Sequence, residues 1–467
     1  MTKNKLILPY ILSDFFSATF VWFLFNRLRF REIAVFEGFG TLTDYFSFLP
    51  VWAGQILIPF FWLSIYYFSG YYSEPVGKSR VTEFFQTFAS VLVGVLMLFF
   101  LVILNDLPRS FEVYYALFFY LFILQFLCTY FLRLGITLCG ISKIKTRQWA
   151  RNVLIIGTGT KAGKVAEQLD RLGYEVVGFV AEKPGGKTVI NTDKLLGTID
   201  HVAQLISHND IHELIIAAET REGADLLALL YPLYRFRLPV KMLAESANVL
   251  SRTKINTLIG VPLVDLTDNH VSYAGENIKH FLDKVISIGV LVFFSPVFVY
   301  LAFRVKRGSP GSIFFSQERI GYMGNPFYIY KFRTMYEGAE GVDKPQLADE
   351  NDSRITPFGR FMRKYRLDEL PQFWNVLKGD MSLVGPRPER AFFINQIVER
   401  APYYYLMQNI RPGITSLGMV KFGYARNVDE MIERLSYDML YYENMSLLFD
   451  LKILVYTIKT VVTGKGI

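Results

Sequence analysis

The sequence predicts a membrane protein of α plus α/β class. We expect an N-terminal four-helix transmembrane bundle, a cytoplasmic Rossmann-like parallel-sheet module, and a mostly helical monotopic domain with a re-entrant helix. Three observations predict this: four long apolar runs, alternating strand and helix patterns after them, and a fifth apolar run broken by Ser295-Pro296. The 467 residues are 52% hydrophobic and 20% charged, against about 25% charged in ordinary soluble domains. Composition therefore disfavours disorder, collagen and a plain cytosolic enzyme. The expected domains are 1–140, 148–265 and 275–467.

The four N-terminal apolar runs are each close to the ~20 residues that cross a bilayer as a helix. They cover residues 7–25, 49–68, 84–104 and 114–139. The first run lacks a small-residue cleavage site and is followed by three more, so we interpret it as an anchor and not as a removed signal peptide. Asp14 lies inside this run. We expect it to serve helix packing, and a functional intramembrane acid is the alternative.

Lysine and arginine predict the orientation, because they are enriched in the cytoplasmic segments of membrane proteins. If the N-terminus is cytoplasmic, the inside segments carry eight of these residues and the outside loops carry four. The outside residues are Arg27, Arg29, Arg31 and Arg109; the inside residues are Lys3, Lys5, Lys78, Arg80, Lys143, Lys145, Arg147 and Arg151. The rest of the chain should therefore face the cytoplasm.

The net charge of +8 indicates anionic lipid or a phosphorylated substrate as a partner. Nucleic acid is not expected, because the sequence has neither zinc-finger spacing nor an RNA-binding signature. The two cysteines, Cys128 and Cys139, fall in or beside one apolar run. They exclude a disulfide framework and a cysteine metal site.

Residues 151–172 show a buried-strand run, a turn with Gly157, Gly159 and Gly163, and a helix pattern. Further strands are predicted at 175–180, 213–218 and 239–243. Such alternation predicts a parallel sheet with crossover helices. The glycine spacing is one residue longer than the dinucleotide fingerprint. A structural or regulatory module is therefore favoured, and nucleotide binding at these glycines remains the alternative.

The fifth apolar run, Val285 to Phe303, has Ser295-Pro296 near its middle and Lys or Arg on both flanks. Proline removes a backbone donor and clashes with the preceding turn, and positive flanks indicate that both ends stay in the cytoplasm. We predict a bent, re-entrant helix over residues 281–304 that enters one leaflet and returns. A fifth crossing with a proline kink is the alternative.

Polar motifs crowd residues 308–420, mixing arginine, lysine and carboxylates with Gly-Pro turns. Such a mixture is typical of a phosphate and metal site, since cations hold phosphoryl oxygens and carboxylates hold Mg²⁺. No histidine follows His280 in the sequence, which excludes histidine-based chemistry there.

Asp368-Glu369 is the candidate centre. Pro371 is tolerated in a first helical turn, so we expect Asp368 at the N-cap of a helix from Glu369 to Lys378. An ordinary acidic helix start is the alternative.

Two further helices are predicted around this region. The helix at 357–366 is apolar on one face and basic on the other, which fits the headgroup layer or a solvated face. The pattern at about 437–462 predicts one last helix, for interfacial anchoring or, as the second choice, core packing.

Taken together, Lys331-Phe-Arg333-Thr-Met, the run from Leu367 to Glu389 and Arg411-Pro-Gly-Ile-Thr resemble the large monotopic phosphoglycosyl transferases, also called bacterial sugar transferases or polyprenyl glycosylphosphotransferases. The resemblance implies transfer of a sugar 1-phosphate from a UDP-sugar to undecaprenyl phosphate, with release of UMP, at the bacterial inner membrane. Membrane lipid is a further partner, and the wide aromatic membrane surface indicates a homodimer.

The resemblance also implies residue roles. Asp368 would attack the phosphate next to the sugar, and Glu369, with Asp368, would help to hold Mg²⁺. Arg387 matches a position associated with the uridine nucleotide. Phosphate contacts are expected from Lys331, Arg333, Arg366 and Arg411. Ser416 and Met419 depart from the family's usual glycine and glutamine, which puts nearby acceptor or sugar contacts in doubt.

Two other functions compete. A membrane nucleotide-sugar dehydratase would need an intact NAD fingerprint and a Tyr-x-x-x-Lys pair, but no tyrosine in the sequence has lysine four residues later. A non-enzymatic scaffold or lipid transporter would not need the carboxylate pair.

Overall fold

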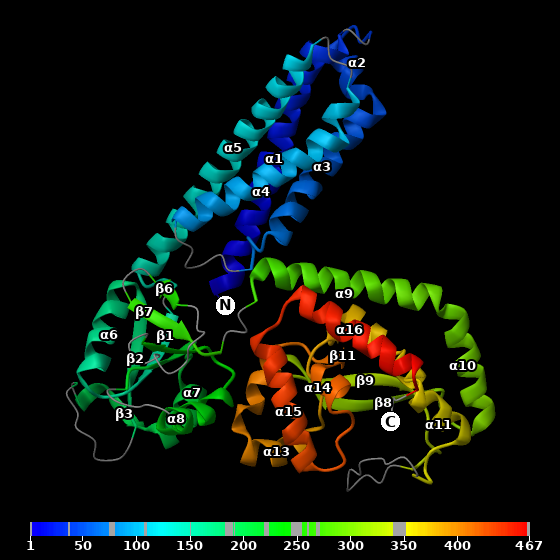
Figure 1. Ribbon diagram of the computed structural model, residues 1–467. Helices are drawn as coiled ribbons and strands as arrows, with labels where there is room; N and C mark the ends of the chain where they lie inside the picture. Colours follow the sequence, from blue (N-terminus) through cyan, green and yellow to red (C-terminus); the bar gives the residue numbers. More distant parts are fainter. Residues whose placement is uncertain are drawn as a thin grey trace.

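The computed structural model describes residues 2–35, 38–73, 80–106, 110–149, 151–182, 190, 192–218, 224–243, 255–258, 261–267, 271–339 and 352–464. A long bundle of helices stands above two rounded parts that lie side by side, the parallel-sheet module and the C-terminal domain (Figure 1). Two residues counted for the orientation, Lys78 and Arg109, lie outside the described residues.

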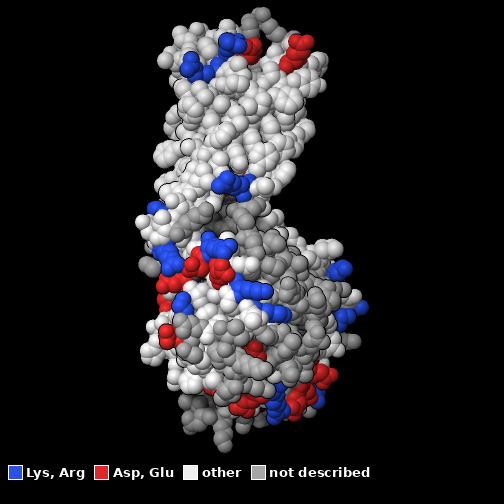
Figure 2. Space-filling view, turned by 90° about the vertical axis from the view of Figure 1, so that its left-hand side faces the viewer, with Lys and Arg blue, Asp and Glu red and all other residues white. Residues whose placement is uncertain are grey.

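Each of the four N-terminal apolar runs forms a long helix, as predicted. The helices are α1 (Thr2–Arg29), α3 (Leu49–Phe68), α4 (Arg80–Leu101) and α5 (Phe111–Lys145), with a short α2 (Leu42–Ser47) between the first two. All four are long and apolar enough to cross a membrane. On the face drawn in Figure 2, charged side chains gather toward the ends of the bundle and leave an uncharged band between them.

Asp14 of α1 is fully buried inside the bundle. Arg133 of α5 donates to its carboxylate from Nε and Nη2, at 2.9 and 2.7 Å. The Tyr72 hydroxyl donates to it at 2.7 Å. These contacts join the first and last helices of the bundle, so Asp14 has the packing role that we expected of it.

The middle module is a seven-stranded sheet in the order β3-β2-β1-β4-β5-β7-β6. Its first five strands are parallel: β1 (Arg151–Ile156), β2 (Tyr174–Ala181), β3 (Leu195–Thr198), β4 (Glu213–Ile216) and β5 (Val240–Leu243). The predicted parallel sheet is thus confirmed. Sequence analysis missed β3 and the antiparallel pair β6 (Ile255–Leu258) and β7 (Val261–Asp265).

Helices cover both faces of this sheet: α6 (Thr160–Arg171), α7 (Val202–His208) and α8 (Ala224–Tyr234). Successive residues of a strand point to opposite faces. Val153 and Ile155 of β1 accordingly belong to the core formed with α6, whereas Leu154 and Ile156 belong to the core formed with α7 and α8.

The three glycines of the β1–α6 turn differ in how closely neighbouring atoms approach them. Gly157 has φ +131°, and a Cβ there would lie 2.5 Å from the carbonyl oxygen of Ala217. Gly159 is the N-cap of α6, and a Cβ on Gly163 would meet only Ile190, at 4.0 Å. The close approach of the backbone is sufficient to explain why residue 157 is a glycine. This supports a structural role for the turn. Nucleotide binding there stays a prediction.

The C-terminal domain begins with two helices, α9 (Tyr273–Phe293) and α10 (Ser295–Gly308), bent by 63° at Phe294. Pro296 lies in the first turn of α10, where its missing N–H costs no hydrogen bond of that helix. The predicted break at Ser295-Pro296 is therefore confirmed.

Among its described residues, the remainder of the domain combines two small sheets with six α-helices. The sheets are the antiparallel pair β8 (Phe314–Ile320) and β9 (Pro326–Phe332) and the parallel pair β10 (Ser382–Val384) and β11 (Gly413–Thr415). The helices are α11 (Pro357–Lys364), α12 (Gln372–Lys378), α13 (Ala391–Arg400), α14 (Leu417–Lys421), α15 (Val428–Glu443) and α16 (Leu447–Val462).

The single helix expected at 437–462 is wrong, because the chain breaks between α15 and α16. Ser446 caps the new helix by accepting a hydrogen bond from the Phe449 N–H at 3.2 Å. The helix predicted at 357–366 ends at Lys364, two residues early, and Arg366 beyond it takes the left-handed conformation with φ +52°.

Candidate active site

Asp368 and Glu369 lie in a single 3₁₀ turn, Leu367–Glu369, immediately before α12. The predicted N-cap role of Asp368 is wrong, since α12 begins only at Gln372, after Pro371. Pro371 has no N–H to continue the helical ladder from the preceding turn. Both carboxylates are nonetheless buried, with Asp368 7% and Glu369 4% exposed.

Three of the predicted cations surround Glu369. Lys331, on β9, donates from Nζ to Glu369 Oε1 at 2.7 Å. Arg387 Nη2 lies 3.6 Å from the same oxygen, and Arg366 Nη1 lies 3.8 Å from Oε2. The fold thus brings together residues from a strand, a turn and the Pro-Arg-Pro segment around one carboxylate.

The two carboxyl groups have opposite electrostatic surroundings. Burial raises the pKa of the Asp368 carboxyl above its usual value, although the charge of Lys331 opposes this. Burial alone would also raise the pKa of Glu369. There the charges of Lys331 and then of Arg387 outweigh burial and hold the pKa well below its ordinary range. Glu369 is therefore a fixed anion.

Tyr424, in the loop after α14, connects two of these cations. The guanidinium carbons of Arg366 and Arg387 each lie 5.1 Å from the centre of its ring. The sequence motifs did not indicate that Tyr424 belongs to the site.

The Pro386–Glu389 segment is fixed from behind by charges that the sequence analysis did not assign to the site. Arg434 of α15 donates to Glu389 Oε1 at 2.5 Å. Arg319 of β8 donates to the Pro388 carbonyl at 3.2 Å and to Glu389 Oε2 at 3.4 Å. These contacts orient the turn that presents Arg387. Arg319 falls within the polar region 308–420 that the sequence analysis noted, whereas Arg434 lies beyond it.

Arg333 and Arg411, which were predicted to contact phosphate, form hydrogen bonds with other parts of the protein. Arg333 donates to the carbonyl oxygens of Ser309 and Pro310, at 2.8 and 2.6 Å. It thereby fixes the segment that follows α10. Arg411 is hydrogen-bonded to His280 of α9 and lies 5.7 Å from the Tyr322 ring centre.

The two departures from the family pattern are both buried. Ser416 is fully buried and caps α14 by accepting the Met419 N–H at 3.0 Å. Met419 is 3% exposed, and its sulfur lies 3.9 Å from Arg434 Nη1. Both residues contribute to internal packing.

A magnesium ion would find only part of its ligands in the protein. Within the described ranges, no group of three or more His, Cys, Asp or Glu residues could hold a metal. Asp368 and Glu369 supply two carboxylates, and Mg²⁺ is commonly bound by one or two carboxylates together with substrate phosphates and water. The donor set therefore fits Mg²⁺ that arrives with a phosphorylated substrate.

Comparisons with known proteins show the family of this chain. A family model described as bacterial sugar transferase matches residues 274–464, and one described as a CoA-binding domain matches residues 67–240. The UDP-glucose:undecaprenyl-phosphate glucose-1-phosphate transferase of Escherichia coli (strain K12) is 31% identical over 340 residues, which cover 70% of this chain and 72% of that protein.

Two other relatives differ in coverage. The undecaprenyl-phosphate galactose phosphotransferase of Salmonella typhimurium is 30% identical over 68% of this chain and 69% of its own length. The UDP-N-acetylgalactosamine-undecaprenyl-phosphate N-acetylgalactosaminephosphotransferase of Aeromonas hydrophila is 41% identical over 189 residues. This match spans less than half of the Aeromonas protein, 44%, and 40% of the chain.

The apolar bundle and these relatives indicate a membrane-associated transferase. The chain belongs to the bacterial polyprenyl glycosylphosphotransferases, the bacterial sugar transferase family. Membership of this family supports neither of the competing functions, the nucleotide-sugar dehydratase and the non-enzymatic scaffold or lipid transporter.

Proposed function

We propose that the protein transfers a sugar 1-phosphate from a UDP-sugar to undecaprenyl phosphate and releases UMP, as the first membrane step of exopolysaccharide, capsule or O-antigen assembly. One observation carries the proposal: two buried carboxylates lie side by side, and three cations lie within 4 Å of the second of them. Within the described part of the chain, no side chain donates a hydrogen bond to the Asp368 carboxylate. Asp368 is thus the carboxylate available to react.

In the proposed reaction, an Asp368 oxygen attacks the phosphorus atom that carries the sugar. The bond from this phosphorus to the bridging oxygen breaks, and UMP leaves with the electron pair. A phosphate oxygen of undecaprenyl phosphate then attacks the same phosphorus. The aspartyl–phosphorus bond breaks, which restores the carboxylate and yields the lipid product. The covalent intermediate lets both substrates use one position in turn.

Lys331, Arg366 and Arg387 neutralise the donor's diphosphate, so that an anionic nucleophile can approach it. Asp368 and Glu369 would hold Mg²⁺, which when bound supplies further charge neutralisation at the phosphates. Glu369 already carries its negative charge at neutral pH, because its pKa is held low by Lys331 and the arginines.

The placement at the inner leaflet rests on exposed apolar surface. Phe293, at the bend between α9 and α10, is 83% exposed, and Val292 beside it is 62% exposed. Such a bend would enter the headgroup layer and return, with both ends in the cytoplasm. Along α16, Leu448, Leu451 and Ile458 are exposed in the same way, which supports interfacial anchoring of this helix.

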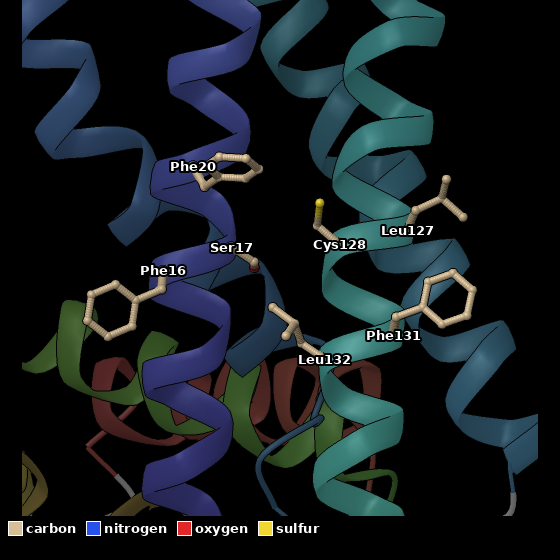
Figure 3. A pocket seen from close by; sticks show the side chains of 7 residues that line it. All are labelled: Phe16, Ser17, Phe20, Leu127, Cys128, Phe131 and Leu132. Carbon is tan, nitrogen blue, oxygen red and sulfur yellow. The ribbon is translucent and has the colours of Figure 1, made fainter.

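The bundle supports a membrane location in the same manner. A groove of about 550 Å³ between α1 and α5 is lined by side chains such as Phe16 and Phe131 (Figure 3). It lies far along the chain from the carboxylates, and its lining is apolar apart from Ser17 and Cys128. We assign it to contact with lipid and not to the reaction.

The test measures UMP release from a panel of UDP-sugars, with Mg²⁺ and polyprenyl phosphate in detergent. We expect release with at least one sugar and, with radiolabelled donor alone, a label on the polypeptide at residue 368. Asp368→Asn should abolish both turnover and label while the protein still folds, because an amide cannot serve as the nucleophile.

Glu443→Gln, at the end of α15, is the control that removes a carboxylate elsewhere, and it should keep full activity. Activity of Asp368→Asn above a tenth of wild type would refute the assignment of the nucleophile. Absence of UMP release with every sugar would refute the proposed function.

A further inference from the structure

Tyr424 occupies an unusual place between two like charges. Tyr424 is 38% exposed, and the guanidinium carbons of Arg366 and Arg387 both lie 5.1 Å from the centre of its ring. The same two groups flank opposite oxygens of the Glu369 carboxylate, at 3.8 and 3.6 Å. The two arginines are therefore held between one carboxylate and one aromatic ring.

Two costs oppose this arrangement of the arginines. The like charges repel each other, and a long flexible side chain loses conformational entropy when it is fixed. Arg366 is weakly tethered, because its Nε is buried with no hydrogen-bond partner among the described residues. The negative face of an aromatic ring attracts a guanidinium within about 6 Å of its centre. Tyr424 is thus placed to offset the repulsion.

We propose that Tyr424 is a positioning residue that holds Arg366 and Arg387 as a pair for the two phosphates of the donor substrate. The inference rests on the proposed function, since it takes the donor to be a nucleoside diphosphate ester. When the diphosphate arrives, the arginines exchange Glu369 for phosphate oxygens while they remain on the ring. Glu369 is then released from them and becomes free to bind a cation.

The first experiment compares Tyr424→Phe with Tyr424→Leu. Phenylalanine keeps the ring, and leucine keeps an apolar side chain without the π face. We expect Tyr424→Leu to raise the KM for UDP-sugar about tenfold with kcat within about twofold, and Tyr424→Phe to stay close to wild type. Equal KM values for Tyr424→Leu and wild type would overturn the inference, and so would a Tyr424→Phe variant as impaired as Tyr424→Leu.

Tyr456→Leu is a matched control. Tyr456 of α16 is 49% exposed, and Lys421 Nζ lies 5.1 Å from the centre of its ring. This variant loses one cation–π contact of the same length outside the carboxylate site, so its KM should not change. A tenfold rise in the control would show that the effect is not specific to Tyr424.

A second measurement does not depend on turnover. Inorganic pyrophosphate should raise the Tm of wild type and of Tyr424→Phe, but much less that of Tyr424→Leu. A wild-type Tm unaffected by pyrophosphate would overturn the inference even if UMP is released. A pyrophosphate response without UMP release from any sugar would instead refute the proposed function and leave the arginine pair supported.

Should Tyr424→Leu fail to fold, fluorinated phenylalanines at position 424 preserve the ring shape while they weaken its negative face. The KM for UDP-sugar, or the pyrophosphate concentration at half-maximal Tm shift, should rise with each added fluorine. A constant value across the series would overturn the inference.

Discussion

Asp368 and Glu369 are neighbours in sequence, yet their surroundings differ enough to separate their roles. Glu369 accepts a hydrogen bond from Lys331 and faces two arginines. Burial dominates at Asp368 and raises the pKa of its carboxyl. A group with this pKa is a better nucleophile once ionised, since basicity and nucleophilicity rise together.

Asp438 provides a test of buried charge behind the site. This α15 residue is buried beside Arg434 and accepts the Gly418 N–H at 2.9 Å. Burial raises the pKa of its carboxyl from 3.8 to about 6, against the opposing charge of Arg434. The folded state therefore binds a proton that the unfolded state has already lost. The stability that this proton contributes is present below about pH 4 and is lost as the pH rises through about 6.

Asp438→Asn should remove this dependence. Its amide oxygen can still accept the Gly418 N–H, but it carries no charge at any pH. Relative to wild type, the variant should gain up to about 3 kcal/mol of unfolding free energy between pH 4 and pH 7. Chemical denaturation across this range measures the gain. Asp429→Asn, at an 80% exposed carboxylate of the same helix, is the control, and an identical pH profile for both variants would contradict the prediction.

Sequence analysis found most of the site, for a reason visible in the residues. Lys331, Glu369 and Arg387 lie in short motifs dense in charge, and such motifs are rarely explained by packing. Tyr424 and Arg434 come from later segments of ordinary composition, and only the fold brings Arg434 to Glu389, 45 residues earlier. Their roles depend on tertiary contacts, which no local sequence pattern could reveal.

The same limit explains Arg333, which has the expected charge but a different partner. Its guanidinium is used by backbone carbonyls after α10. The sequence shows that a cationic side chain is present, but it does not show which acceptor that side chain binds.

At the scale of elements, the bend between α9 and α10 is the feature that the sequence specified most clearly. Apolar length and a central proline are both local signals. The separation of α15 from α16 was missed, because Asn444-Met445-Ser446 contains neither glycine nor proline. The break depends in part on tertiary contact, since the Tyr441 hydroxyl donates to Asp450 of the next helix at 2.7 Å.

The bend also provides a topology test. Ser295→Ala with Pro296→Leu should favour a straight helix and move the end of α10 across the membrane in part of the population. Gly308→Cys serves as the reporter, because a side chain there would meet nothing within 4 Å. Labelling with an impermeant maleimide, in a background without Cys128 and Cys139, compares the two sides of the membrane.

With the native Ser295-Pro296 sequence, the reporter should react only from the cytoplasmic side. In the double variant, a fraction should react from the opposite side. Unchanged cytoplasmic labelling of the double variant would show that the proline does not determine the topology.

At the scale of the whole molecule, the parallel-sheet module docks directly on the C-terminal domain. Arg237, just after α8, donates from Nε to Gln408 Oε1 at 2.9 Å. Tyr231 of α8 lies 5.7 Å from Tyr403, measured between ring centres. Gln408 also lines the small pocket beside Arg387, so this contact reaches the back of the carboxylate–cation site.

Arg237→Gly should weaken the docking. Arg237 has φ +54°, so glycine removes the side chain without backbone strain. The buried Gln408 oxygen would lose its donor, which should lower the unfolding free energy by about 1–2 kcal/mol. Thermal unfolding in detergent measures the loss. Arg235→Gly removes an exposed guanidinium two residues away, and an equal loss in both variants would contradict the prediction.

The ion pair between Asp14 and Arg133 constrains how the protein is made. Its partners are 119 positions apart in the chain, so the first helix emerges from the ribosome long before its counter-charge exists. A lone acid in hydrocarbon is costly, so we expect α1 to be less stable in a membrane before α5 has been synthesised than in the complete bundle. A polypeptide truncated before α5 would therefore leave Asp14 without its ion-pair partner, and we expect its first helices to associate less stably than those of the complete chain.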